Sequence, residues 1–189
     1  SVEHRTKLRN EMINFILKKF DDLAIKTDIS GDLSRASTGV GIIYCRTREE
    51  CDSLNTELQK DFASLKMAPI KIGVFHAKYT PKQRNEVLEK WQNEEIQLII
   101  ATVAFGMGID KPNVRFVIHW TMPTSLTAYY QESGRAGRDN LPSHCRLYFS
   151  KDDFRSIRFL INTEYSKISK NSKTLKEKDA KPISSLCNI

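Results

Sequence analysis

The stretch Val40-Gly-Ile-Ile-Tyr-Cys-Arg-Thr-Arg-Glu-Glu50 decides the fold, because a fully apolar run is followed at once by a helix start. Val40–Cys45 shows no polar alternation, which is typical of a strand that is buried on both faces. Thr47-Arg-Glu-Glu50 is a capping box, in which the Thr hydroxyl and the Glu carboxylate satisfy free backbone N–H groups. The rest of the chain repeats this order of buried strand and helix.

Further strands and helices alternate along the chain on either side of polar turns. A second capping box, Thr80-Pro-Lys-Gln83, predicts another helix start, and Ser125–Ser133 is predicted to be helical. Apolar strands separated by helices imply a parallel sheet between helix layers. The predicted fold class is therefore α/β, with a RecA-like parallel sheet sandwiched between helices in three layers. The further strands are predicted at Ile70–Phe75, Ile96–Ala101, Val114–His119 and Cys145–Phe149.

The domain organisation follows from where this alternation begins and ends. Residues 1–37 are predicted to hold an amphipathic helix and an exposed loop (Lys26–Gly39), and residues 38–165 to hold the α/β lobe. One more helix is expected after Asp152. Residues 166–189 are rich in Lys, Ser and Asn, so we expect a basic, disordered tail or linker. The apolar positions of the first helix are Leu8, Met12, Phe15, Ile16, Phe20 and Leu23.

Composition narrows the class of protein without deciding its function. The 189 residues are 40% hydrophobic and 28% charged, which is the balance of a soluble globular protein. No apolar run approaches the roughly 20 residues that span a bilayer, and no signal peptide is visible, so a nuclear or cytosolic location is expected. The chain lacks a starting Met, which suggests a piece of a longer protein. The net charge of +7 fits a polyanionic partner and a merely solubilising charge equally well.

The cysteines indicate core residues in a reducing compartment. They form no C-x-x-C pair and no zinc spacing with the histidines, so no metal site is predicted. Cys45 and Cys145 lie in apolar runs, and both are expected to be buried thiols. The four cysteines are Cys45, Cys51, Cys145 and Cys187.

In an open parallel sheet, ligands gather at the carboxyl ends of the strands, and the loop after Ala101 is unusual there. Gly106 and Gly108 allow a close approach of the backbone to a ligand. Thr102 offers a hydroxyl at the strand tip, and Asp110 a carboxylate. By itself such a loop is also compatible with a tight surface turn.

A second loop, Tyr129-Tyr-Gln-Glu-Ser-Gly-Arg-Ala-Gly-Arg-Asp139, carries two arginines that each follow a glycine. Guanidinium groups suit phosphate oxygens because they bond bidentately and stay charged. We expect Arg135 and Arg138 to project from the carboxyl edge of the sheet. The alternative, a pair of surface salt bridges, fits the glycines less well.

These segments carry a resemblance to a known family. Gln131-Glu-Ser-Gly-Arg-Ala-Gly-Arg-Asp139 resembles motif VI of superfamily 2 helicases in its RecQ form, and Ile99–Lys111 is similar to motif V. Gly41–Cys51 looks like motif IV. His76-Ala-Lys-Tyr79 departs at two positions from the His-Ala-Gly-Leu usual in that family. The resemblance covers about residues 38–160, and the RecQ5-like branch is the nearest fit.

The resemblance implies the second of two RecA-like lobes in an ATP-dependent 3′–5′ DNA helicase with roles in DNA repair and recombination. Neither a P-loop nor a D-E-x-H motif occurs here, so ATP and Mg²⁺ are expected only in the intact two-lobe protein, and none tightly bound to this fragment. Arg138 is the predicted arginine finger, and Arg135 supports it or couples hydrolysis to DNA movement. Gln131 is expected to couple the two sites, while Gly108 and Asp110 face the ribose or the arginine loop.

Single-stranded DNA is expected along the strand tips. Thr102 is a predicted phosphate contact, and Arg46, Thr47 and Arg48 lie at a helix start that favours anions. For Thr47 simple helix capping is an equal alternative, and His76 is either a DNA ligand or an ordinary polar residue at a strand end.

The expected partners are the first lobe of the same protein and single-stranded or duplex DNA, with no membrane and a monomeric fragment. We predict that the chain alone does not hydrolyse ATP. The rival interpretation is a non-catalytic module that binds DNA or protein. The lysines of the tail would suit such a module.

Overall fold

The computed structural model describes residues 2–30, 39–65, 70–106 and 109–150, together with residues 153–155, 158, 159 and 162. The chain divides into two compact units, Ser1–Ser150 and Lys151–Ile189. The first unit contains the sheet and every predicted site residue.

Five strands form a single sheet in the order β2-β3-β1-β4-β5, and every neighbouring pair is parallel. The register sets Tyr44 beside Ala101 on one side and beside His119 on the other. The carboxyl ends of these strands therefore lie at one edge of the sheet, as the predicted fold requires. The strands are β1 (Val40–Tyr44), β2 (Ile72–Phe75), β3 (Leu98–Ala101), β4 (Val114–His119) and β5 (His144–Leu147).

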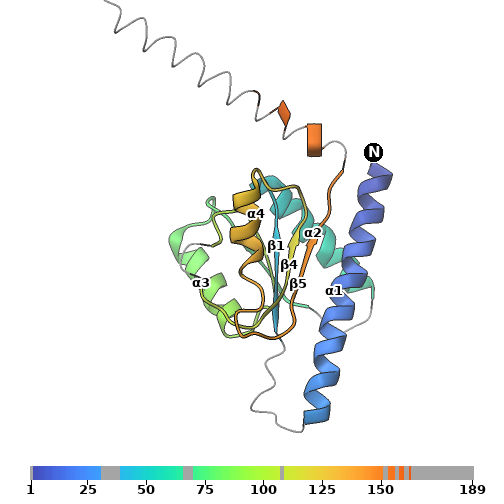
Figure 1. Ribbon diagram of the computed structural model, residues 1–189, viewed down its shortest axis with the longest axis vertical. Helices are drawn as coiled ribbons and strands as arrows, with labels where there is room; N and C mark the ends of the chain where they lie inside the picture. Colours follow the sequence, from blue (N-terminus) through green and yellow to red (C-terminus); the bar gives the residue numbers. More distant parts are fainter. Residues whose placement is uncertain are drawn as a thin grey trace, which may run out of the picture. The chain divides into compact units, whose positions relative to one another are not determined.

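Helices α1 (Val2–Ser30) and α2 (Arg48–Ser64) cover one face of this sheet (Figure 1). Phe15 of α1 meets the ring of Phe116 edge-on, with the ring centroids 5.7 Å apart. The predicted amphipathic helix thus belongs to the core of the lobe. The buried residues of this face that come from the two helices are Met12, Ile13, Phe15, Ile16, Cys51, Leu54 and Leu58.

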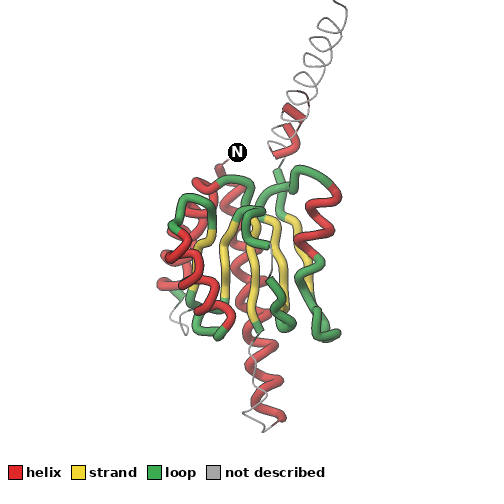
Figure 2. The backbone as a smooth tube through the Cα atoms, turned by 90° about the vertical axis from the view of Figure 1, so that its left-hand side faces the viewer, coloured by secondary structure: helices red, strands yellow, loops and turns green. Residues whose placement is uncertain are grey.

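The other face packs against α3 (Pro81–Gln92) and the segment around α4 (Leu126–Ser133), so helices lie on both sides of the strands (Figure 2). Trp91 of α3 is fully buried and meets the ring of Phe105, which follows β3, with centroids 5.3 Å apart. This arrangement confirms the three-layer α/β architecture.

Both predicted capping boxes are present. The hydroxyl of Thr47 accepts a hydrogen bond from the Glu50 N–H at 3.1 Å, and the Glu50 carboxylate accepts one from the Thr47 N–H at 3.2 Å. Thr80 and Gln83 make the same reciprocal pair at the start of α3, with Pro81 in the first turn.

Several details differ from the expectation. Residues 26–30, predicted to begin a loop, belong to α1, which extends past the ends of the strands (Figures 1 and 2). The expected loop residues 31–38 lie outside the described residues, as does Cys187. The described residues after Asp152 are helical, as predicted.

Cys145 is exposed, so its expected place in the core is wrong. The apolar run that contains it forms β5, which lies at the edge of the sheet with β4 as its only neighbour, and all four of its residues are exposed. Cys45 is buried as predicted, and Cys51 is buried beside it in the same core cluster.

Within the described part of the chain, none of the helices has the length and apolar character needed to cross a membrane.

Candidate functional site

The loop after α4 carries the two glycine-flanked arginines. Its Gly137 has a left-handed φ of +69°, and the Gly137 N–H donates to the carbonyl oxygen of Val114 at 3.0 Å. Val114 is the first residue of β4, so this part of the loop lies at the amino end of the strand. For Arg138, next to Gly137, the expected place at the carboxyl edge is therefore wrong, whereas Arg135 lies against the loop that follows the carboxyl end of β3. The chain leaves β4 at His119, forms α4, and then runs back along the sheet to where β4 began.

Arg135 lies against the loop that follows β3. A Cβ atom at Gly106 would lie 2.2 Å from Arg135 Nη2, so only glycine leaves room for the guanidinium. The charge of the same guanidinium acts to lower the pKa of Tyr44 at the end of β1, but burial has the larger effect and raises it. The Nε of Arg135 is buried and has no hydrogen-bond partner among the described residues.

Arg138 is held more loosely. Its Nη1 donates to Asp110 Oδ1 at 2.8 Å and to the carbonyl oxygen of Ile109 at 3.2 Å. The exposed fraction is 39% for the Arg138 side chain and 84% for that of Asp110. Solvent screens an ion pair this open, and such pairs contribute only about 0–1 kcal/mol. Another anion can therefore take the place of Asp110.

The two arginines line one open hollow on the face of the sheet. The structure thus brings together four of the predicted nucleotide-site residues, namely Gln131, Arg135, Arg138 and Asp110, while Gly108 lies outside the described residues. The complete lining is Gly106, Ile109, Asp110, Tyr130, Gln131, Gly134, Arg135 and Arg138.

Arg115, which the sequence reasoning missed, anchors this loop. Its buried guanidinium donates to both carboxylate oxygens of Asp139 at 2.5 Å, and Asp139 directly follows Arg138. Burial acts to raise the pKa of Asp139, but hydrogen bonds from Arg115 and from the Leu141 N–H outweigh it and lower that pKa. Arg115 also donates to the carbonyl oxygens of Pro112, Asn113 and Pro142, and so ties the β3–β4 connection to the arginine loop.

Of the predicted DNA-binding residues at the carboxyl edge of the sheet, Arg46 is partly exposed and Thr47 and Arg48 are exposed, whereas Thr102 and His76 are buried. Arg46 follows β1, and its backbone N–H donates to Glu50 Oε2 and Thr121 Oγ1, both at 3.0 Å. Thr47 and Arg48 are exposed at the start of α2. Thr102, at the tip of β3, is 8% exposed.

His76 lies at the same edge but is fully buried. Its Nε2 is 3.1 Å from Asp52 Oδ1, and its ring stacks on that of Tyr79 with the centroids 4.5 Å apart. A direct contact with DNA would require the ring to leave this position, so the geometry favours the ordinary polar residue over the ligand.

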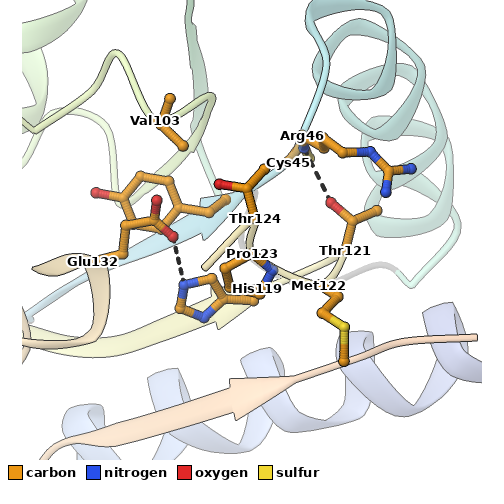
Figure 3. Close-up of a pocket in the computed structure, with 10 residues that line it drawn as sticks. Cys45, Arg46, Val103, His119, Thr121, Met122, Pro123, Thr124 and Glu132 are labelled. Carbon is orange, nitrogen blue, oxygen red and sulfur yellow. Dashed lines mark hydrogen bonds and ion pairs between the residues drawn. The ribbon is translucent and has the colours of Figure 1, made fainter. Parts of the chain in front are cut away.

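A small second pocket of about 100 Å³ opens between the carboxyl ends of β1 and β4 (Figure 3). At its base, the buried pair His119 and Glu132 is joined by a contact of 2.8 Å between Nε2 and Oε2. His119 also stacks on Tyr44, with ring centroids 5.6 Å apart. The sequence offered only a weak signal for this pair, a histidine at a strand end and a carboxylate thirteen residues later.

No cluster of His, Cys, Asp or Glu within the described ranges is arranged to hold a metal ion. The two guanidiniums that line the hollow, one of them with an easily exchanged partner, give it a cationic character next to the backbone of Gly106 and Gly134. Such a surface suits the oxygens of a phosphate chain.

Comparison with known proteins agrees with this chemistry. The family model described as the helicase conserved C-terminal domain matches residues 18–140, about two thirds of the chain. The chain therefore belongs to the helicase C-terminal domain family.

Within that family it is a RecQ-type lobe. It is 47% identical over 133 residues to the ATP-dependent DNA helicase Q5 of Rattus norvegicus, a match that covers 70% of this chain and 13% of the relative. It is 46% identical over 131 residues to the helicase SGS1 of Saccharomyces cerevisiae, covering 69% of this chain and 9% of the relative. It is also 50% identical over 126 residues to the RecQ-like DNA helicase BLM of Xenopus laevis, covering 66% and 9%. The chain thus spans only a small part of these relatives.

Solved structures support the fold. A DEAD box protein from Methanococcus jannaschii superposes with a TM-score of 0.53 at 20% identity, over 77% of this chain and 36% of that one. Domain 2 of the DEAD-box helicase Mss116p, solved with an RNA duplex, gives a TM-score of 0.53 at 26% identity, over 69% and 48%.

Proposed function

We propose that this chain is the second motor lobe of an ATP-dependent 3′–5′ DNA helicase, and that it donates arginines to an ATP site completed by the first lobe. The observation that carries the proposal is the shared hollow, in which Arg135 and Arg138 face the same open space beside Gln131 and Asp110.

Arg138 is the proposed arginine finger because its pair with Asp110 is open to solvent and weak. A triphosphate carries more negative charge than one carboxylate, so it competes well for this guanidinium. Donated arginines stabilise charge on the transferring phosphoryl group, an effect of about 10³–10⁵ in rate. Arg135 is held by its surroundings and has a buried Nε to spare, which suits a supporting or coupling role.

ATP and Mg²⁺ are bound, in this proposal, mainly by the first lobe, because the chain contains no P-loop. The residues here act on the outer phosphates by donating hydrogen bonds and by supplying positive charge. The chain alone is therefore expected not to hydrolyse ATP.

The proposed DNA track runs along the carboxyl edge of the sheet. Arg46, Thr47, Arg48 and Thr102 offer guanidiniums, hydroxyls and a helix start to the phosphates of a single strand. We assign His76 a supporting place behind this edge, because its ring is buried against Asp52 and Tyr79. The eukaryotic helicases among the relatives support a nuclear location and a role in DNA repair and recombination.

The test is hydrolysis by the intact two-lobe protein carrying Arg138→Ala. We expect the DNA-dependent kcat to fall by about 10³-fold or more, while ATP binding changes little, since binding rests on the first lobe. The matched control is Arg9→Ala, which removes an arginine paired with Asp61 at 3.0 Å on the opposite face of the sheet. Turnover by Arg138→Ala within tenfold of the wild type would remove the finger assignment, and equal loss of ATP binding would do so as well. Unwinding of duplexes with a single 3′ or 5′ tail decides the polarity.

A further inference from the structure

A continuous set of contacts joins the arginine hollow to the carboxyl edge of the sheet. Tyr44 is the last residue of β1, and its side chain is 3% exposed. Its hydroxyl donates to the carbonyl oxygen of Phe105 at 2.8 Å, and the next residue, Gly106, lies against the Arg135 guanidinium. Two residues further along the chain, Arg46 begins the proposed DNA track.

Burial and nearby charges both act on the Tyr44 hydroxyl. Burial raises the pKa of Tyr44, and the Arg135 guanidinium acts in the opposite direction without cancelling that effect. The hydroxyl therefore keeps its proton at physiological pH. It can then donate to the carbonyl oxygen of Phe105, which fixes the loop that carries Gly106 relative to the end of β1.

The ring of Tyr44 is held as firmly as its hydroxyl. It stacks on the ring of His119 with the centroids 5.6 Å apart. The Nε2 atom of His119 lies 2.8 Å from Glu132 Oε2 (Figure 3). Glu132 belongs to α4, three residues before Arg135. The segment that carries Arg135 is thus linked to Tyr44 in two ways, through the buried pair and through the Phe105–Gly106 backbone that lies against the guanidinium.

The Arg135 guanidinium lies close against the backbone of Gly106, where a Cβ atom would lie 2.2 Å from Nη2. Because Tyr44 holds the preceding residue, Phe105, by a hydrogen bond of 2.8 Å, a movement of the end of β1 would be passed to the backbone on which Arg135 rests.

We propose that Tyr44 is a positioning residue that holds Arg135 in place for ATP hydrolysis and transmits the state of the DNA edge at Arg46 to that arginine. This inference rests on the proposed function of the arginine hollow. It assigns Tyr44 no contact with ATP or DNA, and its whole effect passes through Arg135.

The experiment compares Tyr44→Phe with Tyr148→Phe in the intact two-lobe protein. Tyr148 is also a buried tyrosine, 6% exposed, and its hydroxyl accepts a hydrogen bond from Arg146 at 3.3 Å. It belongs to the core cluster of the other sheet face, so it controls for the loss of a buried tyrosine hydroxyl. For Tyr44→Phe we expect the DNA-dependent kcat to fall about tenfold, since the hydrogen bond that fixes Phe105 and the backbone under Arg135 is lost. For Tyr44→Phe, the KM for ATP and the DNA concentration that gives half the maximal rate should stay within about twofold of the wild-type values.

The control, Tyr148→Phe, should retain the wild-type kcat.

A double-mutant cycle with Arg135→Lys separates positioning from a general loss of structure. If Tyr44 acts through Arg135, Tyr44→Phe should reduce the rate much less in the Arg135→Lys protein than in the wild type. Effects that multiply independently would overturn the inference, as would a Tyr44→Phe protein with the kcat of Tyr148→Phe.

Gly106→Ala provides a second route if Tyr44→Phe does not fold. It displaces the same guanidinium directly and leaves Tyr44 intact, so the same fall in kcat is expected, and this fall should again shrink in the Arg135→Lys protein. A wild-type kcat for Gly106→Ala would count against the inference. Failure of the proposed function is distinguishable, because it would appear as an active Arg138→Ala protein whatever the Tyr44 variants do.

Discussion

Replacing Arg115 by methionine tests how the arginine loop is held. Methionine keeps much of the length and the apolar contacts of the side chain, but it removes every hydrogen bond that the guanidinium makes. Asp139 would lose its bidentate partner, and the carbonyl oxygens of Pro112, Asn113 and Pro142 would lose a donor. The Arg115 side chain is 8% exposed and that of Asp139 is 22% exposed, so water can compensate only for part of this loss.

The expected cost in the free energy of unfolding is about 3 kcal/mol. Removing one partner from a buried ion pair costs about 3–5 kcal/mol, and the lower end applies because Asp139 keeps some contact with solvent. For a chain of this size, such a change lowers the melting temperature by roughly 6–12 °C.

Urea unfolding of the 189-residue chain, followed by circular dichroism, measures this change. Arg146→Met is the control, because Arg146 lies on the exposed edge strand with its guanidinium 4.0 Å from the Phe15 ring centroid, and its loss should cost about 1 kcal/mol or less. A difference of under 1 kcal/mol between Arg115→Met and the wild type would refute the reasoning. In the intact protein, Arg115→Met should also lower the kcat for hydrolysis, since Asp139 directly follows Arg138.

Two further predictions concern Asp139 and Thr47. The pKa of Asp139 is lowered in the folded chain. Its contribution to stability is therefore fully present above its ordinary pKa of about 3.9 and is lost as the pH falls through the folded pKa. The acid unfolding of Asp139→Asn should depend less steeply on pH below about 4 than that of the wild type, and identical profiles would contradict this. Thr47→Ala and Thr80→Ala each remove one capping hydroxyl and should each lower the free energy of unfolding by about 1 kcal/mol. If Thr47 also contacts a DNA phosphate, only Thr47→Ala should weaken the binding of single-stranded DNA by the intact protein. Equal DNA affinities of the two variants would leave Thr47 with the capping role alone.

Much of the fold could be predicted from local patterns. The run Val40–Tyr44 and the capping boxes at Thr47 and Thr80 depend on neighbours within a few residues, so periodicity and cap chemistry identify them. The amphipathic spacing of α1 was equally visible, although its end at Ser30 was not. An apolar run, by contrast, does not reveal whether its strand lies in the centre of a sheet or at its edge, and Cys145 was misplaced for that reason.

The candidate site was likewise only partly predictable from the sequence. The sequence alone determined that two glycine-flanked arginines and a glycine-rich loop belong to one helicase-type lobe, because residue types and their spacing along the chain carry that information. Only the tertiary structure decided where they lie: Gly137 bonded to Val114 at the amino end of β4, and Arg138 paired with Asp110. It also decided that Arg115 anchors the loop and that His76 is buried. These contacts join residues that are distant along the chain, and their geometry is set by how the sheet, α4 and the β3–β4 connection pack together, which no local pattern encodes.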